Sequence, residues 1–141
     1  DIATILLNPQ REMEALAEFA GQADAVLVDA PCSGTGTWRR NPEARWRLTP
    51  ARLDRLIGEQ ARIQDFAAPL VKPGGGLLYA TCALVDREGR DQVAAFLARH
   101  AGWTADPIDL PVGRAHGGGT LLTPGHDGSD GFFFARLRRG A

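Results

Sequence analysis

Lysine is almost absent from this chain of 141 residues, in which Lys72 is the single example. Arginine therefore carries the positive charge, and 16 basic against 17 acidic side chains leave a net charge of -1. No overall field draws such a protein to nucleic acid or to a membrane, so any such binding has to be local. The chain also lacks an apolar run near the roughly 20 residues that a membrane-spanning helix needs. We therefore expect no membrane partner.

Cysteine is scarce too, since Cys32 and Cys82 are the only two. Their separation matches neither a small secreted disulfide framework nor a zinc-binding spacing, which favours free thiols in a reducing cytoplasm. Apolar residues make up 44% of the chain and charged residues 23%, as in an ordinary globular domain with a core. The length leaves room for one domain.

Apolar runs and helical repeats alternate along the chain. The runs that predict strands are residues 2–7, 25–28, 77–80 and 132–137. Helical spacing predicts helices over 9–20, over 49–70 behind the Thr49-Pro50 start, and after Asp86 as a cap, with Val93, Phe96 and Leu97 on the inner face. The glycine- and proline-rich stretch from 103 to 130 is predicted to form loops. This order is typical of an α/β sandwich with a mostly parallel sheet and helices on both faces.

Both cysteines follow a predicted buried strand. Cys32 lies in the segment 29–36, directly after Val28, and Cys82 lies two positions after Ala80. Functional residues of parallel sheets gather beyond the carboxyl ends of the strands. A single free cysteine is usually a small buried hydrophobe, but two at adjoining strand ends favour a function. If the two strands are neighbours, the thiols face one pocket.

A set of motifs, in order from about Asp24 onward, resembles the RNA cytosine-C5 methyltransferases of the Nol1/Nop2/Sun (Fmu) family. The set as a whole is specific, whereas either cysteine motif alone is only suggestive. Its members are Asp29-Ala30-Pro31-Cys32-Ser33-Gly34-Thr35-Gly36, Arg39-Arg40-Asn41-Pro42, Arg45-Trp46, Lys72-Pro73-Gly74-Gly75, Tyr79-Ala80-Thr81-Cys82 and Asp130-Gly131-Phe132-Phe133.

The resemblance implies a Rossmann-like fold that uses S-adenosylmethionine to methylate RNA. Carbon 5 of cytosine is a poor nucleophile until a thiolate adds at carbon 6, and the resemblance assigns that attack to Cys82. Cys32 would assist elimination and product release. Asp29 would lie between the methyl donor and the base, as a catalytic and cofactor-binding residue, and Asn8 is at best a remnant of the adenine-side contact.

The chain departs from the family pattern in three places. Ala83 replaces the usual serine after the nucleophile, and Glu88-Gly89-Arg90 replaces an acidic-asparagine-acidic triplet. The glycine-rich cofactor loop and the acidic ribose ligand are missing upstream of Asp24. We therefore expect residues 1–141 to be the carboxyl half of a catalytic domain, with its sheet flank covered by the missing half or by a partner. Alone, this half is expected to be inactive.

Arginines surround Trp46 directly after the first cysteine motif, and we predict that they contact RNA. The alternative is a solvated surface in which they pair with Glu43 and Asp54 while Trp46 packs in the core, and Trp46 itself is expected to be structural. The arginines are Arg39, Arg40, Arg45 and Arg47.

No metal site is predicted, because His116, His126, Asp127 and Asp130 lack tight ligand spacing. The expected substrate is ribosomal RNA of the small subunit (16S), with transfer RNA second. Two other classes stay open. One is a non-catalytic RNA-binding module that kept the fold, and the other is a DNA cytosine methyltransferase, against which the Thr81-Cys82 match argues.

Overall fold

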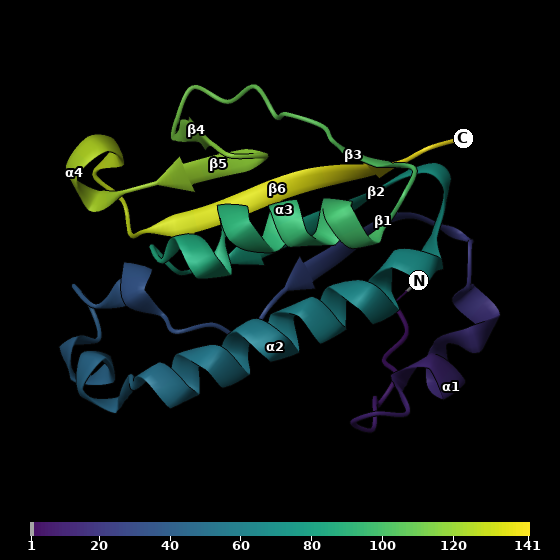
Figure 1. The fold of residues 1–141 in the computed structure, drawn as a ribbon, viewed down its shortest axis with the longest axis horizontal. Helices are drawn as coiled ribbons and strands as arrows, with labels where there is room; N and C mark the ends of the chain where they lie inside the picture. The colour runs from purple at the N-terminus through teal and green to yellow at the C-terminus, as the bar shows by residue number, and fades with distance from the viewer. Residues whose placement is uncertain (1) are drawn as a thin grey trace.

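The computed structural model describes residues 2–141, which form a six-stranded sheet with helices against it (Figure 1). The strands follow the order β1-β2-β6-β5-β4, and β3 pairs with β6 beside this path. Their bounds are β1 Ala23–Asp29, β2 Val71–Thr81, β3 Trp103–Ala105, β4 Arg114–His116, β5 Gly119–Leu122 and β6 Phe132–Arg139.

The sheet is mixed rather than mostly parallel. Strands β1 and β2 are parallel, with Asp29 opposite Ala80, whereas the pairs β2–β6, β3–β6, β4–β5 and β5–β6 are antiparallel. Strands β4, β5 and β6 follow one another through connections shorter than the crossover that a parallel pair requires, so each folds back on the strand before it. The expected α/β class is confirmed, and the expected dominance of parallel pairing is wrong.

The longest helix, α2 (Pro50–Ala67), begins where the sequence predicts. The Thr49 hydroxyl oxygen accepts a hydrogen bond from the Arg52 amide at 3.2 Å, and Pro50 occupies the first turn. Helix α3 (Arg90–Arg99) begins after Gly89 rather than at Asp86, so the predicted cap is wrong. Asp86 instead pairs with His116 at 2.6 Å and Arg90 at 2.7 Å.

The other helical segments are short. They are α1 Glu12–Leu16 and α4 Pro124–Asp127, with 3-10 turns η1 Ala17–Phe19, η2 Thr35–Thr37, η3 Pro42–Arg47, η4 Ala68–Leu70 and η5 Asp86–Glu88. Within residues 2–141, no helix combines the length and the apolar character needed to cross a membrane.

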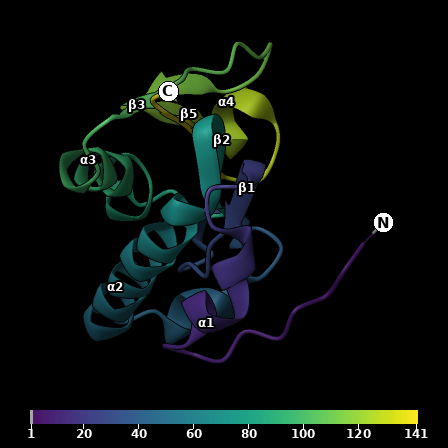
Figure 2. The same cartoon turned by 90° about the vertical axis from the view of Figure 1, so that its right-hand side faces the viewer.

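The core lies between the sheet and the two long helices, which share one face (Figure 2). Leu77, Tyr79 and Phe133 are fully buried there against Val93 and Phe96 of α3. On the opposite face Leu27 of β1 is 65% exposed, although the run at 25–28 is typical of a strand covered on both faces. The prediction of helices on both faces is therefore wrong for α2 and α3.

The predicted amino-terminal strand does not form. Residues 2–8 carry no regular structure, with Ile2 fully exposed and Leu6 83% exposed, and the predicted helix over 9–20 reduces to α1 and η1. An apolar run becomes a strand only where a sheet edge accepts its backbone hydrogen bonds. This run does not pair with β1, whose partner strand is β2.

The predicted loop region 103–130 contains β3, β4, β5 and α4. These strands are three or four residues long, which is too short to show an alternating pattern in the sequence. Their pairing depends on the distant strand β6, so local sequence does not reveal it.

Candidate functional site

The two thiols meet at the carboxyl ends of β1 and β2. The Cys32 and Cys82 sulfur atoms lie 3.3 Å apart, and both residues are partly buried free cysteines. Parallel pairing produces this contact, because Asp29 and Ala80 stand opposite each other and each cysteine follows within three residues. The expectation that neighbouring strands bring the two thiols together is confirmed.

Burial disfavours ionisation of the Cys32 thiol. Removal from water, followed by the hydrogen bond with Cys82, raises the pKa of the Cys32 thiol from 9.0 to about 12. Cys32 is therefore a neutral thiol at pH 7. A neutral thiol can donate a hydrogen bond to a neighbouring sulfur but is a poor nucleophile.

Two glycines bring a third segment against the cysteine loops. The Gly36 amide donates to the Cys82 carbonyl at 3.0 Å, and the Gly131 amide donates to the Gly36 carbonyl at 2.8 Å. A β-carbon on Gly36 would stand 2.6 Å from the carbonyl carbon of Gly131 and collide with its oxygen. Close backbone approach thus requires glycine here.

A buried polar cluster supports the same loops, and no sequence motif points to its role. Glu88 and Gln60 are both fully buried, and the Gln60 amide donates to the Glu88 carboxylate at 3.0 Å and to the Pro31 carbonyl at 2.9 Å. Glu88 also accepts a hydrogen bond from the Ser33 amide at 2.8 Å. The available signal is Gln60 itself, a polar residue on the apolar stripe of α2.

The two residues expected on the cofactor side both lie at the surface. Asp29 is exposed at the end of β1 and lines an apolar cleft of about 280 Å³ together with Leu7 and Leu27. Asn8 is exposed in the adjacent turn, where its carbonyl accepts from the Arg11 amide at 3.0 Å.

The ion pairs of the arginine segment differ from those expected for a solvated surface. Arg39 and Arg40 bind Asp130 rather than Glu43 or Asp54, and they hold the pKa of the Asp130 carboxyl below its usual range. Asp54 pairs with Arg87 at 2.7 Å.

Trp46 is not a core residue. It is 76% exposed, and the Arg45 guanidinium lies over its ring at 4.4 Å. The 3-10 geometry of η3 turns this side chain outward, which helical periodicity does not anticipate. Arg45 and Arg47 are exposed beside it.

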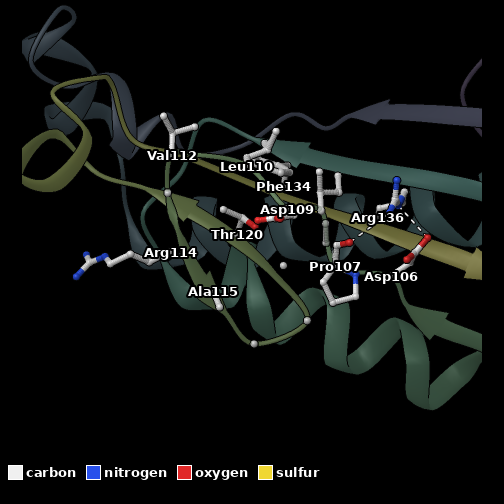
Figure 3. A pocket seen from close by; sticks show the side chains of 16 residues that line it. Asp106, Pro107, Asp109, Leu110, Val112, Arg114, Ala115, Thr120, Phe134 and Arg136 are labelled. Atoms are coloured by element: carbon white, nitrogen blue, oxygen red, sulfur yellow. Dashed lines mark hydrogen bonds and ion pairs between the residues drawn. The ribbon is translucent and has the colours of Figure 1, made fainter.

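Neither the histidines nor the cavity of Figure 3 adds to this site. His116 binds Asp86 and His126 binds Asp127, so the two histidines are held in separate pairs. A cavity of about 250 Å³ lies under the loop of residues 106–113, against Phe134 and Arg136 (Figure 3). Neither cysteine lines it.

Comparison with known proteins agrees with these motifs. The family model described as 16S rRNA methyltransferase RsmB/F matches residues 3–138. The chain belongs to the RsmB/F family. The ribosomal RNA small subunit methyltransferase B of Xanthomonas campestris is 42% identical over 135 residues, which are 95% of this chain and 31% of that protein. The Thermus thermophilus protein of the same name is 43% identical over 84% of this chain and 30% of its own length.

Solved structures extend the RsmB/F likeness to the fold. The crystal structure of PH0851 superposes with a TM-score of 0.80 at 36% identity, over 85% of this chain and 27% of that one. NSun6 from Pyrococcus horikoshii gives a TM-score of 0.71 at 24% identity, over 82% of this chain and 29% of its own, and so supports the fold alone. The chain thus spans about a third of the length of the relatives it matches.

The close approach of Gly36 and Gly131 predicts that two alanine substitutions in this RsmB/F chain change the free energy of unfolding in opposite directions. Gly36→Ala should lower the free energy of unfolding by about 3 kcal/mol, because the backbone of Gly131 cannot yield to a new methyl group. Gly58→Ala, in the interior of α2 with nothing within 4 Å of the added carbon, should raise it by about 1 kcal/mol. Urea unfolding of both variants measures the difference, and equal values would contradict the crowding argument.

The raised pKa of Cys32 predicts an unusual pH profile of alkylation. Iodoacetamide reacts with thiolate, so its rate at Cys32 should still rise about tenfold per pH unit at pH 9, where an ordinary thiol levels off. Peptide mass spectrometry after timed labelling follows Cys32 separately from Cys82. A plateau near pH 9 would show that burial does not control this thiol.

Proposed function

We propose that this chain is the catalytic part of a 16S ribosomal RNA cytosine-C5 methyltransferase that takes its methyl group from S-adenosylmethionine. The observation that carries the proposal is the 3.3 Å contact between the Cys32 and Cys82 sulfurs at adjoining strand ends. The names of the relatives, ribosomal RNA small subunit methyltransferase B, support ribosomal RNA as the substrate. Two free thiols fit a cytoplasmic protein.

The roles of the two thiols follow from what cytosine requires. The Cys82 thiolate adds to carbon 6, which makes carbon 5 an enamine-like nucleophile that can accept a methyl group. Water in the site then takes the carbon 5 proton, and the electron pair returns to the ring and expels the Cys82 sulfur as thiolate. Cys32, a protonated thiol in contact with that sulfur, can assist this elimination by donating a hydrogen bond to the departing thiolate.

The residues on the cofactor side fit one flank of S-adenosylmethionine. Asp29 presents an exposed carboxylate next to the apolar cleft lined by Leu7 and Leu27, which suits a ligand with polar and apolar parts. Asp29 would hold the cofactor and orient the base, with Asn8 at the adenine side. When bound, S-adenosylmethionine supplies the electrophilic methyl group.

The arginine segment supplies a surface for RNA close to the thiols in the sequence. Arg45 and Arg47 are exposed, and Trp46 offers a ring face on which an unstacked base can lie. Arg39 and Arg40 are fixed by Asp130 and can still reach phosphate oxygens with their remaining N–H donors. Local positive charge thus compensates for the net charge of -1.

Replacement of each cysteine tests this assignment in a protein that carries the whole catalytic domain around this chain. Cys82→Ala should lower methyl transfer to 16S ribosomal RNA at least about 1000-fold, because the nucleophile is lost. Cys32→Ala should instead retain RNA covalently through Cys82. Filter-bound radioactive methyl and denaturing gels measure the two effects.

Three results of that experiment would contradict the proposal. An unmodified protein without activity on ribosomal RNA would favour a non-catalytic RNA-binding module, and activity on transfer RNA alone would change the substrate. Failure of Cys32→Ala to retain RNA under denaturing conditions would refute the two-cysteine mechanism.

The 141 residues alone should neither bind S-adenosylmethionine appreciably nor turn over, because they provide only the Asp29 flank of its site. Calorimetric titration of this chain with the cofactor should therefore give only heats of dilution. Saturable binding in the micromolar range would show that the described residues form a complete cofactor site.

A further inference from the structure

Glu88 is a buried carboxylate that lies between the segments carrying the two cysteines. It is 0% exposed, and within residues 2–141 its side-chain partners are three uncharged donors. The Ser33 amide donates to it at 2.8 Å, the Ser33 hydroxyl donates to its other oxygen, and Gln60 donates at 3.0 Å. Burial of a carboxylate is unfavourable unless such bonds compensate. Two of these bonds come from Ser33, and the third comes from Gln60 of α2.

The side chain of Glu88 fixes the loop of Cys32. Ser33 follows Cys32 directly, and both its amide and its hydroxyl are held by the same carboxylate. On the other side of Cys32, the Gln60 amide donates a hydrogen bond to the Pro31 carbonyl at 2.9 Å. The residues that precede and follow Cys32 are thus both fixed by hydrogen bonds.

The backbone of Glu88 fixes the strand that ends at Cys82. Its carbonyl accepts a hydrogen bond from the Tyr79 hydroxyl at 2.8 Å and faces the Thr81 hydroxyl at 3.4 Å. Tyr79 and Thr81 are fully buried in β2, and Thr81 directly precedes Cys82. One residue therefore bonds to the immediate neighbours of both thiols.

We propose that Glu88 is a positioning residue that holds the Cys32 and Cys82 sulfurs in contact, which rests on the function proposed above. It does not touch the reacting atoms, and it acts through the placement of the two loops. Its geometry rather than its charge matters. A glutamine can reproduce the bonds, because its amide oxygen accepts from Ser33 and Gln60 while its amide nitrogen donates to the Ser33 hydroxyl. An alanine removes the acceptor that the Ser33 amide, the Ser33 hydroxyl and the Gln60 amide share, so the loop of Cys32 loses these bonds.

Closure of the Cys32–Cys82 disulfide measures this placement directly in the purified chain. Oxidised glutathione takes two electrons from the thiol pair and yields one intramolecular disulfide and two glutathione molecules. Glu88→Ala should slow closure about tenfold to hundredfold, since small displacements strongly reduce reactions between positioned groups. Glu88→Gln should stay within about threefold of the unmodified chain.

Gln92→Ala is the matched control for loss of a buried amide. Gln92 is 3% exposed and bonds to Gln60 and to the Ile57 carbonyl, but it does not contact either cysteine loop. The Gln92→Ala variant should be less stable than the unmodified chain. Its disulfide should close at a rate within about threefold of the unmodified chain, because the bonds that hold the cysteine loops are intact. Equal slowing in Gln92→Ala and Glu88→Ala would overturn the proposal, as would normal closure in Glu88→Ala.

A second variant tests the same contact in another way. If Glu88→Ala does not fold, Ser33→Ala removes one bond to the carboxylate and should slow closure by an intermediate factor. Normal closure in Ser33→Ala would then count against the proposal, as would slow closure in Glu88→Gln.

In a protein with the whole domain, Glu88→Ala should lower kcat for methyl transfer while the KM for RNA stays unchanged. Disulfide closure needs neither RNA nor cofactor. An unmodified protein without methyl transfer would therefore contradict the proposed function while leaving the closure result valid.

Discussion

The parallel pairing of β1 with β2 is the constraint on which the site depends. Parallel neighbours end at the same edge, so residues that follow each strand are brought together even though fifty positions separate them in the chain. Asp29 stands opposite Ala80, and the Ala30 amide continues the ladder to the Ala80 carbonyl at 3.0 Å. Without the pairing of these two strands, nothing would bring Cys32 and Cys82 together. The antiparallel strands begin with β6, which pairs with the other edge of β2 and so leaves β2 in the interior of the sheet.

Backbone hydrogen bonds at the strand ends fix the loops of Cys32 and Cys82 relative to each other. Gly36 joins the segment after Cys32 to the Cys82 carbonyl, and Gly131 joins the start of β6 to Gly36. Leu84 adds another link, since its amide donates to the Thr35 hydroxyl at 2.8 Å. Main-chain groups thus link the loops in addition to the Glu88 and Gln60 side chains, and the close main-chain approach explains the glycines of these motifs. A thiol pair held this way is already arranged for chemistry before any substrate arrives.

Much of this arrangement could be predicted from the sequence, because local signals decide it. The Thr49-Pro50 start, the apolar runs of β1, β2 and β6, and the position of each cysteine beyond its strand are all encoded within a few residues. The direction of the other strands was missed, since it depends on pairing with β6 rather than on local pattern. The run at 2–7 lacks a sheet edge, which an isolated pattern does not reveal.

Side-chain environments were harder to predict than strands. Glu88 looked like part of an imperfect motif, and only the fold shows its carboxylate inside the loop of Cys32. Trp46 is expected from the sequence to be structural, with packing in the core as one alternative, but a short 3-10 turn places it outside. The direction in which a side chain points from an irregular segment depends on backbone angles that composition does not specify.

The uncovered side of β1 has a consequence for how this chain behaves in solution. Its outer edge has no partner strand within residues 2–141, and Leu27 beside that edge is 65% exposed. Such an edge offers a row of free amide and carbonyl groups next to apolar surface, which is a template for adding another extended segment. Concentrated solutions of the isolated chain should therefore aggregate by strand addition along β1, and charged residues placed there would improve its solubility.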